Sequence, residues 1–211
     1  MIKLVAFDLD GTIADTIPMC IEAFKLAVTP YCSKDLSESD IVETFGLNEE
    51  GMIKQVISKD WEKALNDFYT IYEQMHTIRI QPFSGIRELI TKLKEESIIT
   101  PLITGKGQRS CNITLRHLKM EALFDSISVG TPDKNTKAES MMKLMLNYNI
   151  QPTEVVYVGD EYSDITACRK VGVRCLSAAW GASPSKIEML EKENQGYVFS
   201  SVKSLRSFLL K

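Results

Sequence analysis

Short apolar runs recur along the chain, and each run ends in polar or small residues. The first run covers residues 2–7, and similar runs cover 98–103, 126–129, 155–159 and 174–178. An apolar run of this length without polar alternation is typical of a strand that is buried on both faces. We therefore expect these five segments to be strands of one parallel sheet.

Segments with helical spacing of apolar positions lie between and after these runs. They cover residues 85–96, 108–118, 136–148, 164–171 and 202–210. Alternating strands and helices indicate an α/β fold, in which short right-handed crossovers place helices against a parallel sheet. The fold class that we expect is a Rossmann-like parallel sheet core with helices on both faces.

Residues 16–81 interrupt this alternation, because they contain helical spacing and no further strand-like run. The helices expected there are 19–28, 49–57 and 61–78. Residues 30–39 have the composition of a loop. We interpret 16–81 as an all-helical cap domain that is inserted after the first strand.

The remaining residues, 1–15 and 82–211, would then form the α/β core domain. The two places where the chain passes between the domains are Asp15-Thr16 and Gln81-Pro82, and we expect hinges there. A helical cap over the end of a sheet commonly closes over a ligand and excludes water.

Composition narrows the class of protein without identifying it. The chain has 211 residues, 44% of them hydrophobic, which is enough for one good core with a smaller unit beside it. A net charge of -3 with no basic patch argues against nucleic-acid binding.

The N-terminal apolar run is too short for a signal peptide or a membrane span, so we expect a cytoplasmic protein. Five scattered cysteines predict reduced thiols, and nothing predicts an oligomeric state.

Candidate chemistry gathers where the expected strands end. Asp8, Thr104 and Asp160 each follow an apolar run, and ligands of open α/β sheets bind beyond the carboxyl ends of the strands. Asp8 and Asp10 stand two residues apart, and burying such charges without partners would be costly. A turn with an Asx-type cap is the alternative interpretation of this segment.

A divalent cation would compensate these carboxylates, because Mg²⁺ takes hard oxygen ligands and substrate phosphate oxygens. Asp8 would then be a metal ligand and also a nucleophile, which forms an aspartyl-phosphate and so splits phosphoester hydrolysis into two easier steps. Asp10 would act as general acid and then as general base.

The segment Phe7-Asp8-Leu9-Asp10-Gly11-Thr12-Ile13-Ala14-Asp15-Thr16 resembles the first motif of the haloacid dehalogenase superfamily of phosphohydrolases. Thr104-Gly105 is similar to the second motif of that family, a hydroxyl residue that binds the phosphoryl group. An N-cap for the following helix is the alternative role for Thr104.

The third motif is a lysine before a helix, and Lys137 fits it best, with Lys134 as the competitor. Ala138 follows where many relatives have Pro. The segment ending Gly159-Asp160 resembles the fourth motif. The resemblance implies Mg²⁺ ligands at Asp8, Asp10 and Asp160, and Asp164 as the residue that holds the lysine or a metal-bound water. A simple acid at a helix N-terminus is the alternative for Asp164.

The implied activity is a Mg²⁺-dependent phosphatase that acts on a small phosphorylated metabolite. The segment ending Trp180-Gly181 is similar to phosphoglycolate-phosphatase-like members, while Asp10 disfavours dehalogenase and phosphonatase chemistry. Two alternatives remain open: a sugar-phosphate mutase of the β-phosphoglucomutase type, and a non-catalytic binding or regulatory protein on the same fold.

Two features of the cap and its surroundings carry weaker expectations. Residues 46–54 are the candidate specificity loop, chosen by position, and Lys54 is the group within it that could meet an anion. His76 and His117 have no ligand spacing to each other, so surface or interhelical contacts are expected for both and no catalytic role is assigned.

Overall fold

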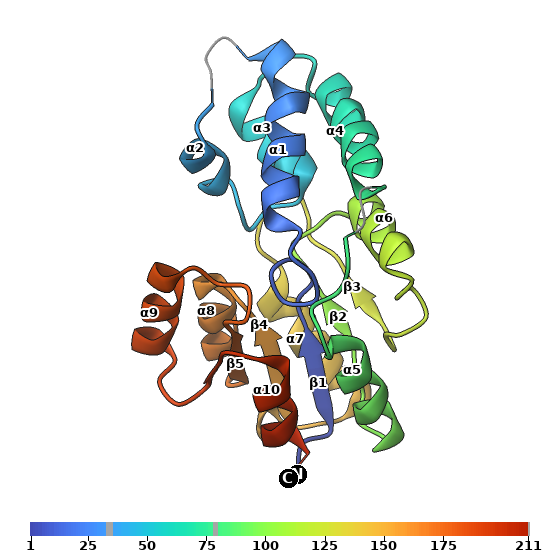
Figure 1. Cartoon of the computed structure of the whole chain (residues 1–211), viewed down its shortest axis with the longest axis vertical. Helices are drawn as coiled ribbons and strands as arrows, with labels where there is room; N and C mark the ends of the chain where they lie inside the picture. Colours follow the sequence, from blue (N-terminus) through green and yellow to red (C-terminus); the bar gives the residue numbers. More distant parts are fainter. Residues whose placement is uncertain (33–35, 78–79, 211) are drawn as a thin grey trace.

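The computed structural model describes residues 1–32, 36–77 and 80–210. In these residues the chain forms one parallel sheet with the strand order β3-β2-β1-β4-β5-β6 (Figure 1). The parallel α/β class expected from the sequence is confirmed. The strands are β1 (Leu4–Phe7), β2 (Leu102–Ile103), β3 (Ile127–Ser128), β4 (Val155–Gly159), β5 (Arg174–Ala178) and β6 (Val198–Phe199).

The strands β4 and β5 have the predicted bounds, whereas β2 is much shorter than the predicted 98–103. The backbone of this segment does follow β1, since Ile99 bridges Leu4. Pro101 has no N–H to donate, which interrupts the ladder before Leu102. The strand β6 was not predicted, because a pair of strand residues leaves no recognisable run in the sequence.

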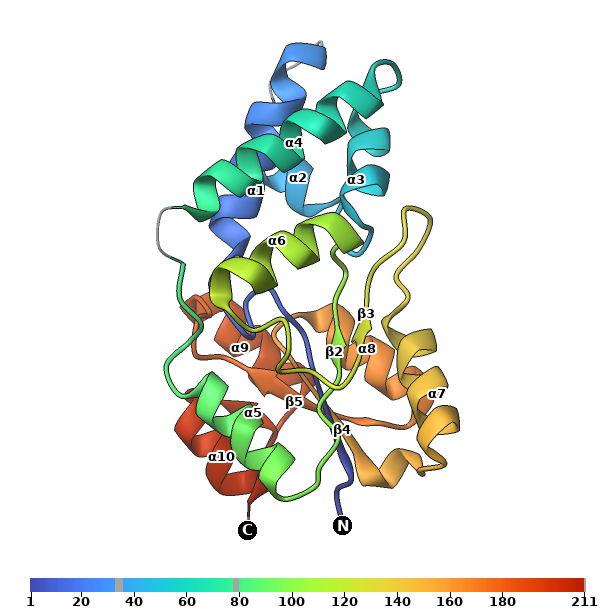
Figure 2. The same ribbon diagram turned by 90° about the vertical axis from the view of Figure 1, so that its right-hand side faces the viewer.

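Helices cover both faces of the sheet, as expected (Figure 2). Residues alternate along β1, so that Val5 and Phe7 pack against the helices of one face, while Leu4 and Ala6 pack against those of the opposite face. The helix at residues 184–193 was not predicted. The core helices are α5 (Ile86–Glu95), α6 (Gln108–Leu118), α7 (Lys137–Tyr148), α8 (Tyr162–Val171), α9 (Pro184–Glu193) and α10 (Val202–Leu209), with a short 3₁₀ helix η2 (Pro152–Glu154).

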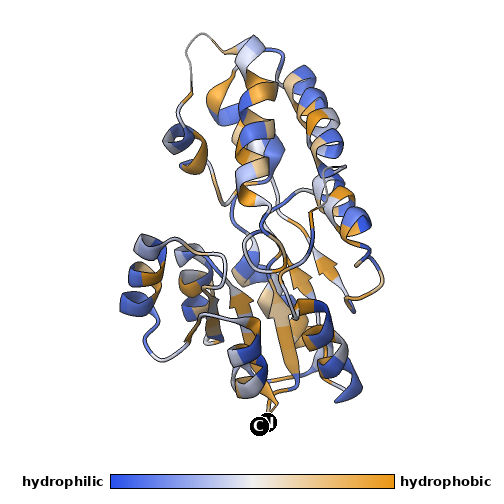
Figure 3. Cartoon of the chain, viewed as in Figure 1, coloured by the Kyte–Doolittle hydropathy of each residue, from blue (hydrophilic) through white to orange (hydrophobic). Residues whose placement is uncertain are grey.

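Burial of apolar surface is the main stabilising contribution to this arrangement. The strands are hydrophobic along their length, while the helices carry hydrophobic and hydrophilic residues on different sides (Figure 3). A fully buried side chain such as Phe7 contributes on the order of 2–3 kcal/mol through removal from water. None of the helices in the described ranges is long and apolar enough to cross a bilayer.

A helical unit lies beyond the carboxyl end of the sheet and has its own apolar core (Figure 1). Phe24, Ile53 and Phe68 are fully buried in it. The short helix α2 occupies a segment for which no helix was predicted. Residues 33–35 of the predicted loop, and residue 78 of the predicted last helix, lie outside the described residues. The helices are α1 (Ile17–Val28), α2 (Glu38–Val42), α3 (Glu49–Val56) and α4 (Trp61–His76), with a 3₁₀ helix η1 (Thr29–Tyr31).

The two connections between this unit and the sheet run side by side. Phe83 N–H donates to the Ile13 carbonyl at 2.8 Å, and Ala14 forms an isolated bridge with Pro82. A second contact lies far from these connections, where Asn48 N–H donates to the Thr131 carbonyl at 3.0 Å. The helical unit therefore also contacts the core away from its two connections.

Candidate active site

The carboxyl ends of three neighbouring strands bring the predicted polar residues together. Asp8 follows β1, Thr104 follows β2 and Asp160 follows β4, and all three side chains are buried. Because β1 lies between β2 and β4 in the sheet, its aspartate lies between the other two residues. The sequence placed these residues at one rim, and the structure shows them there.

Lys137 connects two of the buried carboxylates. Its ammonium donates to Asp8 Oδ2 at 2.7 Å and to Asp164 Oδ1 at 2.5 Å. Burial alone would lower the pKa of Lys137, but Asp164 and Asp8 hold that pKa above its usual value, so the lysine is charged. The competitor Lys134 is exposed and pairs with Glu139 instead.

Asp164 combines the two roles that the sequence left open. One carboxylate oxygen accepts from Lys137, and the other accepts from the Glu161 N–H at 3.0 Å at the beginning of α8. A carboxylate at a helix N-terminus is stabilised by the helix dipole and by free N–H groups. Asp164 therefore anchors the lysine and caps the helix at the same time.

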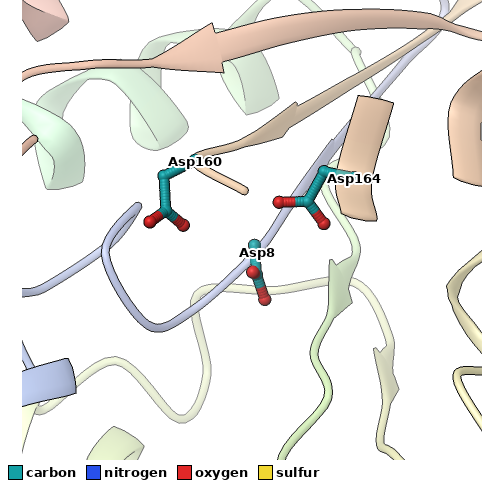
Figure 4. A group of neighbouring side chains, drawn as sticks. All are labelled: Asp8, Asp160 and Asp164. Carbon is teal, nitrogen blue, oxygen red and sulfur yellow. The ribbon is translucent and has the colours of Figure 1, made fainter. Parts of the chain in front are cut away.

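Asp8, Asp160 and Asp164 are neighbours at the rim of the sheet (Figure 4), and one carboxylate oxygen of each lies within 4.8 Å of those of the other two. Burial is the main reason that the pKa of Asp8 rises to about 8. Lys137 opposes this rise, but the negative charges of Asp164 and Asp160 add to it, so the net shift is upward. Burial likewise raises the pKa of Asp160 to about 7 despite the lysine that contacts it, Lys186. The cluster holds more negative charge than its surroundings compensate.

This donor set fits a hard divalent cation such as Mg²⁺, which prefers carboxylate oxygens. Asp8 and Asp160 follow the adjacent strands β1 and β4, whereas Asp164 lies in the first turn of α8 and anchors Lys137 there, so Asp8 and Asp160 are the candidate direct ligands. Asp160 Oδ1 accepts from Thr12 Oγ1 at 3.2 Å, and its Oδ2 accepts from Lys186 at 2.5 Å. A bound cation would share the Asp160 carboxylate with these donors.

The side chain of Asp10, predicted from the sequence as a metal ligand, lies apart from this cluster. Its Oδ1 accepts a short hydrogen bond from Thr16 Oγ1, at the beginning of α1. The carboxylate also lies 3.5 Å from Lys106 Nζ. Asp10 therefore faces the helical unit, where a leaving group would lie if a phosphoryl group were bound at Asp8.

The turn between Asp8 and Asp10 and the first helix depends on a glycine. Gly11 has a φ of +73°, and a Cβ there would lie 2.2 Å from Asp160 Oδ2. Only glycine adopts this conformation without strain and leaves room for the carboxylate. Trp180 supports the same turn, since its Nε1 donates to the Thr12 carbonyl at 3.1 Å.

Thr104 and Gly105 line the cavity beside Asp8. The Thr104 hydroxyl accepts from the Lys106 N–H at 3.2 Å, while Gly107 is the N-cap residue of α6. The alternative role of Thr104 as N-cap is therefore wrong. Gly105 is packed so closely against Gly130 that a Cβ on Gly130 would lie 1.9 Å from the Gly105 carbonyl oxygen.

The cavity lies between the rim of the sheet and the helical unit, with about 100 Å³ of water-accessible volume. Phe45, Gly46 and Leu47 line it, and so do Glu49 and Met52 of α3. The candidate specificity loop 46–54 overlaps the predicted helix 49–57, and from Glu49 onward the segment is helix, as that prediction expects. Its first residues do face the candidate site.

Lys54 does not face the cavity, which corrects the expectation that it could meet an anion there. Its ammonium pairs with Glu50 at 2.5 Å and lies 3.9 Å from the centre of the Trp61 ring. The side chain projects from the outer side of α3 because Met52 and Ile53 occupy the buried side.

Three charged residues of the site were missed in the sequence: Glu49, Lys106 and Lys186. Lys106 stands two residues after Thr104, and this spacing could have suggested it. Glu49 lies on α3 and accepts from Gly107 N–H at 2.9 Å and from Ser110 Oγ. It therefore provides a hydrogen-bond acceptor for the N-terminus of the core helix α6. Lys186 lies on α9, for which no helix was predicted, and nothing in its sequence context indicates a role.

His76 lies in a buried interhelical contact, as expected, and takes no part in the candidate site. Its Nδ1 pairs with the Tyr72 carbonyl at 2.8 Å and its Nε2 with Thr114 Oγ1 at 3.1 Å. A carbonyl only accepts, so Nδ1 carries the proton and Nε2 accepts from the threonine. The Tyr72 hydroxyl lies 3.0 Å from the same Thr114 oxygen and completes the network between α4 and α6.

Acid should weaken this contact, because burial lowers the pKa of His76 to about 4. Below about pH 6.5, this histidine binds a proton in the unfolded chain more readily than in the folded chain. Its contribution to the free energy of unfolding is therefore fully present above pH 6.5 and is lost as the pH falls toward 4. We expect His76 to account for a loss on the order of 2 kcal/mol in unfolding free energy between pH 7 and pH 4.5. Urea titrations of wild type and His76→Gln should differ in pH dependence by this amount, whereas parallel curves would contradict the assignment.

Taken together, the parallel sheet, the helical unit beyond its carboxyl end and the buried carboxylate–lysine cluster define a class of α/β hydrolytic enzymes. A family model for haloacid dehalogenase-like hydrolases matches residues 5–178. The chain belongs to this family of hydrolases, and the resemblance found in the sequence motifs is confirmed.

Individual relatives agree with this assignment. A PpaX protein of Caldanaerobacter subterraneus is 29% identical over 200 residues, covering 93% of this chain and 89% of the relative. A phosphoglycolate phosphatase of Synechococcus elongatus is 23% identical over 181 residues, covering 85% and 84%. The crystal structure of a hydrolase from Pseudomonas syringae superimposes with a TM-score of 0.80 at 21% identity, covering 99% of this chain and 98% of that one, which shows the shared fold.

Proposed function

We propose that this protein is a Mg²⁺-dependent phosphatase that hydrolyses a small phosphomonoester through an aspartyl-phosphate on Asp8. The observation that carries the proposal is the ammonium of Lys137, bonded to both Asp8 and Asp164 beneath a cavity that also exposes Asp10. A buried carboxylate held by a lysine, with a second acid nearby, suits nucleophilic attack on an anionic phosphoryl group.

The hydrogen bonds of Asp8 prepare it for that attack. Its Oδ1 accepts from the Leu9 N–H at 2.8 Å and its Oδ2 accepts from Lys137, so the carboxylate is fixed in orientation. Lys137 offsets the negative charge that accumulates as nucleophile and phosphoryl group approach. Thr104 and Gly105 would bind the phosphoryl oxygens from the side of β2.

Asp10 would move the protons. In the first step it protonates the leaving oxygen as the bond to phosphorus breaks, and in the second it takes a proton from the water that attacks the aspartyl-phosphate. Thr16 holds its carboxylate on the side of the helical unit, where the leaving group would lie.

Mg²⁺ would be held by Asp8 and Asp160, with Asp164 positioning the lysine. When bound, it would supply positive charge that shields the attacking carboxylate from the phosphate. Chelation is therefore expected to abolish turnover, and added Mg²⁺ to restore it.

The cavity favours a small substrate. A single water needs roughly 10–15 Å³ of such volume, so about 100 Å³ accommodates a phosphate with only a few further atoms. Residues 16–81 would act as the cap that excludes bulk water over this space. Relatives named phosphoglycolate phosphatase and pyrophosphatase PpaX support the choice of small phosphorylated compounds.

The test is phosphate release from a panel of phosphoglycolate, pyrophosphate, sugar phosphates and nucleoside monophosphates, measured with Mg²⁺ and with a chelator. Metal-dependent release from one or more small compounds is the expected result. A mutase would instead isomerise a sugar phosphate with little release, and a non-catalytic protein would do neither. Either of the last two outcomes would overturn the proposal.

A further inference from the structure

Lys106 is a buried cation in the cavity whose hydrogen-bonding capacity is largely unused. Its side chain is 4% exposed, and its nearest carboxylate oxygens are Asp10 Oδ1 at 3.5 Å and Glu49 Oε1 at 3.9 Å. Cys20 Sγ lies at 3.7 Å. None of these oxygens is within the 2.7–2.9 Å typical of a charge-assisted hydrogen bond.

The comparison with Lys137 shows how unusual this arrangement is. Lys137 has two carboxylate partners at 2.7 and 2.5 Å, and both belong to the reaction centre. The carboxylates near Lys106 are engaged elsewhere: Asp10 accepts from Thr16, and Glu49 accepts from Gly107 and Ser110. The ammonium of Lys106 can therefore donate to a ligand without breaking a close ion pair.

The other groups that face Lys106 favour its charged form and leave its ammonium free of a close ion pair. The face of the Tyr72 ring lies 4.4 Å from Nζ, which stabilises a cation, while its hydroxyl pairs with Thr114. Burial raises the pKa of the Cys20 thiol to about 11, so that thiol is neutral. For Lys106 itself, the effect of burial is outweighed by its acidic neighbours, Asp10 first, and its pKa stays well above the usual value.

The position of Lys106 identifies the part of a substrate that it would meet. Lys106 and Asp10 line the same cavity, and Asp10 is the residue proposed to protonate the leaving oxygen. A group that contacts Lys106 would thus belong to the leaving group, a few bonds from phosphorus. Ile17, Leu47 and Met52 add apolar lining to the cavity. Glu49 also lines it, but both of its carboxylate oxygens already accept hydrogen bonds, from Gly107 N–H and Ser110 Oγ.

We propose that Lys106 binds a second anionic group on the substrate, a carboxylate or a phosphate carried by the leaving group, and so selects doubly anionic small phosphoesters. This inference rests on the proposed function, because it places the leaving group beside Asp10. The buried ammonium supplies the counter-charge that such a group needs once water is excluded.

The test compares two non-hydrolysable phosphonates by calorimetry in the presence of Mg²⁺. Phosphonopropionate carries a carboxylate, and propylphosphonate has a methyl group in its place. Wild type should bind phosphonopropionate about tenfold more tightly or better. In Lys106→Met the ratio should fall to within about twofold, with the affinity for propylphosphonate unchanged.

Three further variants keep the result interpretable. Lys106→Gln repeats the test if the Met variant does not give a cooperative melting transition, and Lys106→Arg should retain most of the preference because it retains the charge. Lys134→Met removes an exposed lysine outside the cavity and should change neither affinity.

The inference is overturned if wild type shows no preference, if the preference persists in the neutral variants, or if both affinities fall together. The phosphate-release panel tests the proposed function separately. Release without a phosphonate preference would leave the phosphatase in place and remove the role of Lys106. A preference without release would leave Lys106 as an anion-binding residue of a protein that is not a phosphatase.

Discussion

Replacing Asp8 by Asn is expected to reduce phosphate release on the order of 10⁴-fold or more, because an amide cannot form the aspartyl-phosphate. The substitution keeps the size of the side chain and removes one of three buried carboxylates. Lys137 retains its bond to Asp164, so the local structure should persist. The measurement is kcat on the best substrate of the panel, together with mass spectrometry of acid-quenched wild type to detect the phosphorylated aspartate.

Asp15→Asn is the matched control, since Asp15 stands in the same segment but is exposed. This variant should retain activity within about threefold of wild type, as expected for a surface substitution. Asp8→Asn activity above one tenth of wild type would show that another group is the nucleophile. Absence of a phosphorylated peptide, despite rapid turnover, would favour direct attack by water.

Replacing Lys137 by Met should affect both catalysis and stability. The variant leaves Asp8 and Asp164 buried without their shared cation, and removing one partner of a buried ion pair typically costs about 3–5 kcal/mol. Loss of charge compensation at the nucleophile should also lower kcat by about 10²–10³-fold. Urea unfolding at pH 7 and steady-state kinetics measure the two effects.

The control for this experiment is Lys134→Met, which removes a lysine three residues away. Lys134 is exposed and forms a surface ion pair with Glu139, so its loss should cost no more than about 0.5 kcal/mol. Equal effects of the two substitutions would contradict the assignment of Lys137 as the lysine of the site. Lys137→Arg should recover part of the stability, because it restores a positive charge, but not the full activity, because its geometry differs.

Much of the fold and of the reaction centre could be predicted from local sequence. The run that ends at Asp8 and the run that ends at Asp160 are continuous and β-branched, so both strands were found where they lie, with β4 correct to the residue. Parallel strands present their carboxyl ends at one edge, and this geometry alone predicts that the two aspartates approach. Short strands without a run, and the helix α9, gave no comparable signal.

The sequence by itself therefore determined the α/β class and the residues that follow the strands at the rim of the sheet. Only the tertiary structure decided that Lys137 reaches Asp8, that Lys54 turns away and that Lys106 and Glu49 line the cavity. The physical reason is that strand burial and helical spacing follow from neighbouring residues, whereas the direction of a charged side chain depends on packing between distant segments. Glu49 and Gly107, which are 58 residues apart, meet because the helical unit rests on the core.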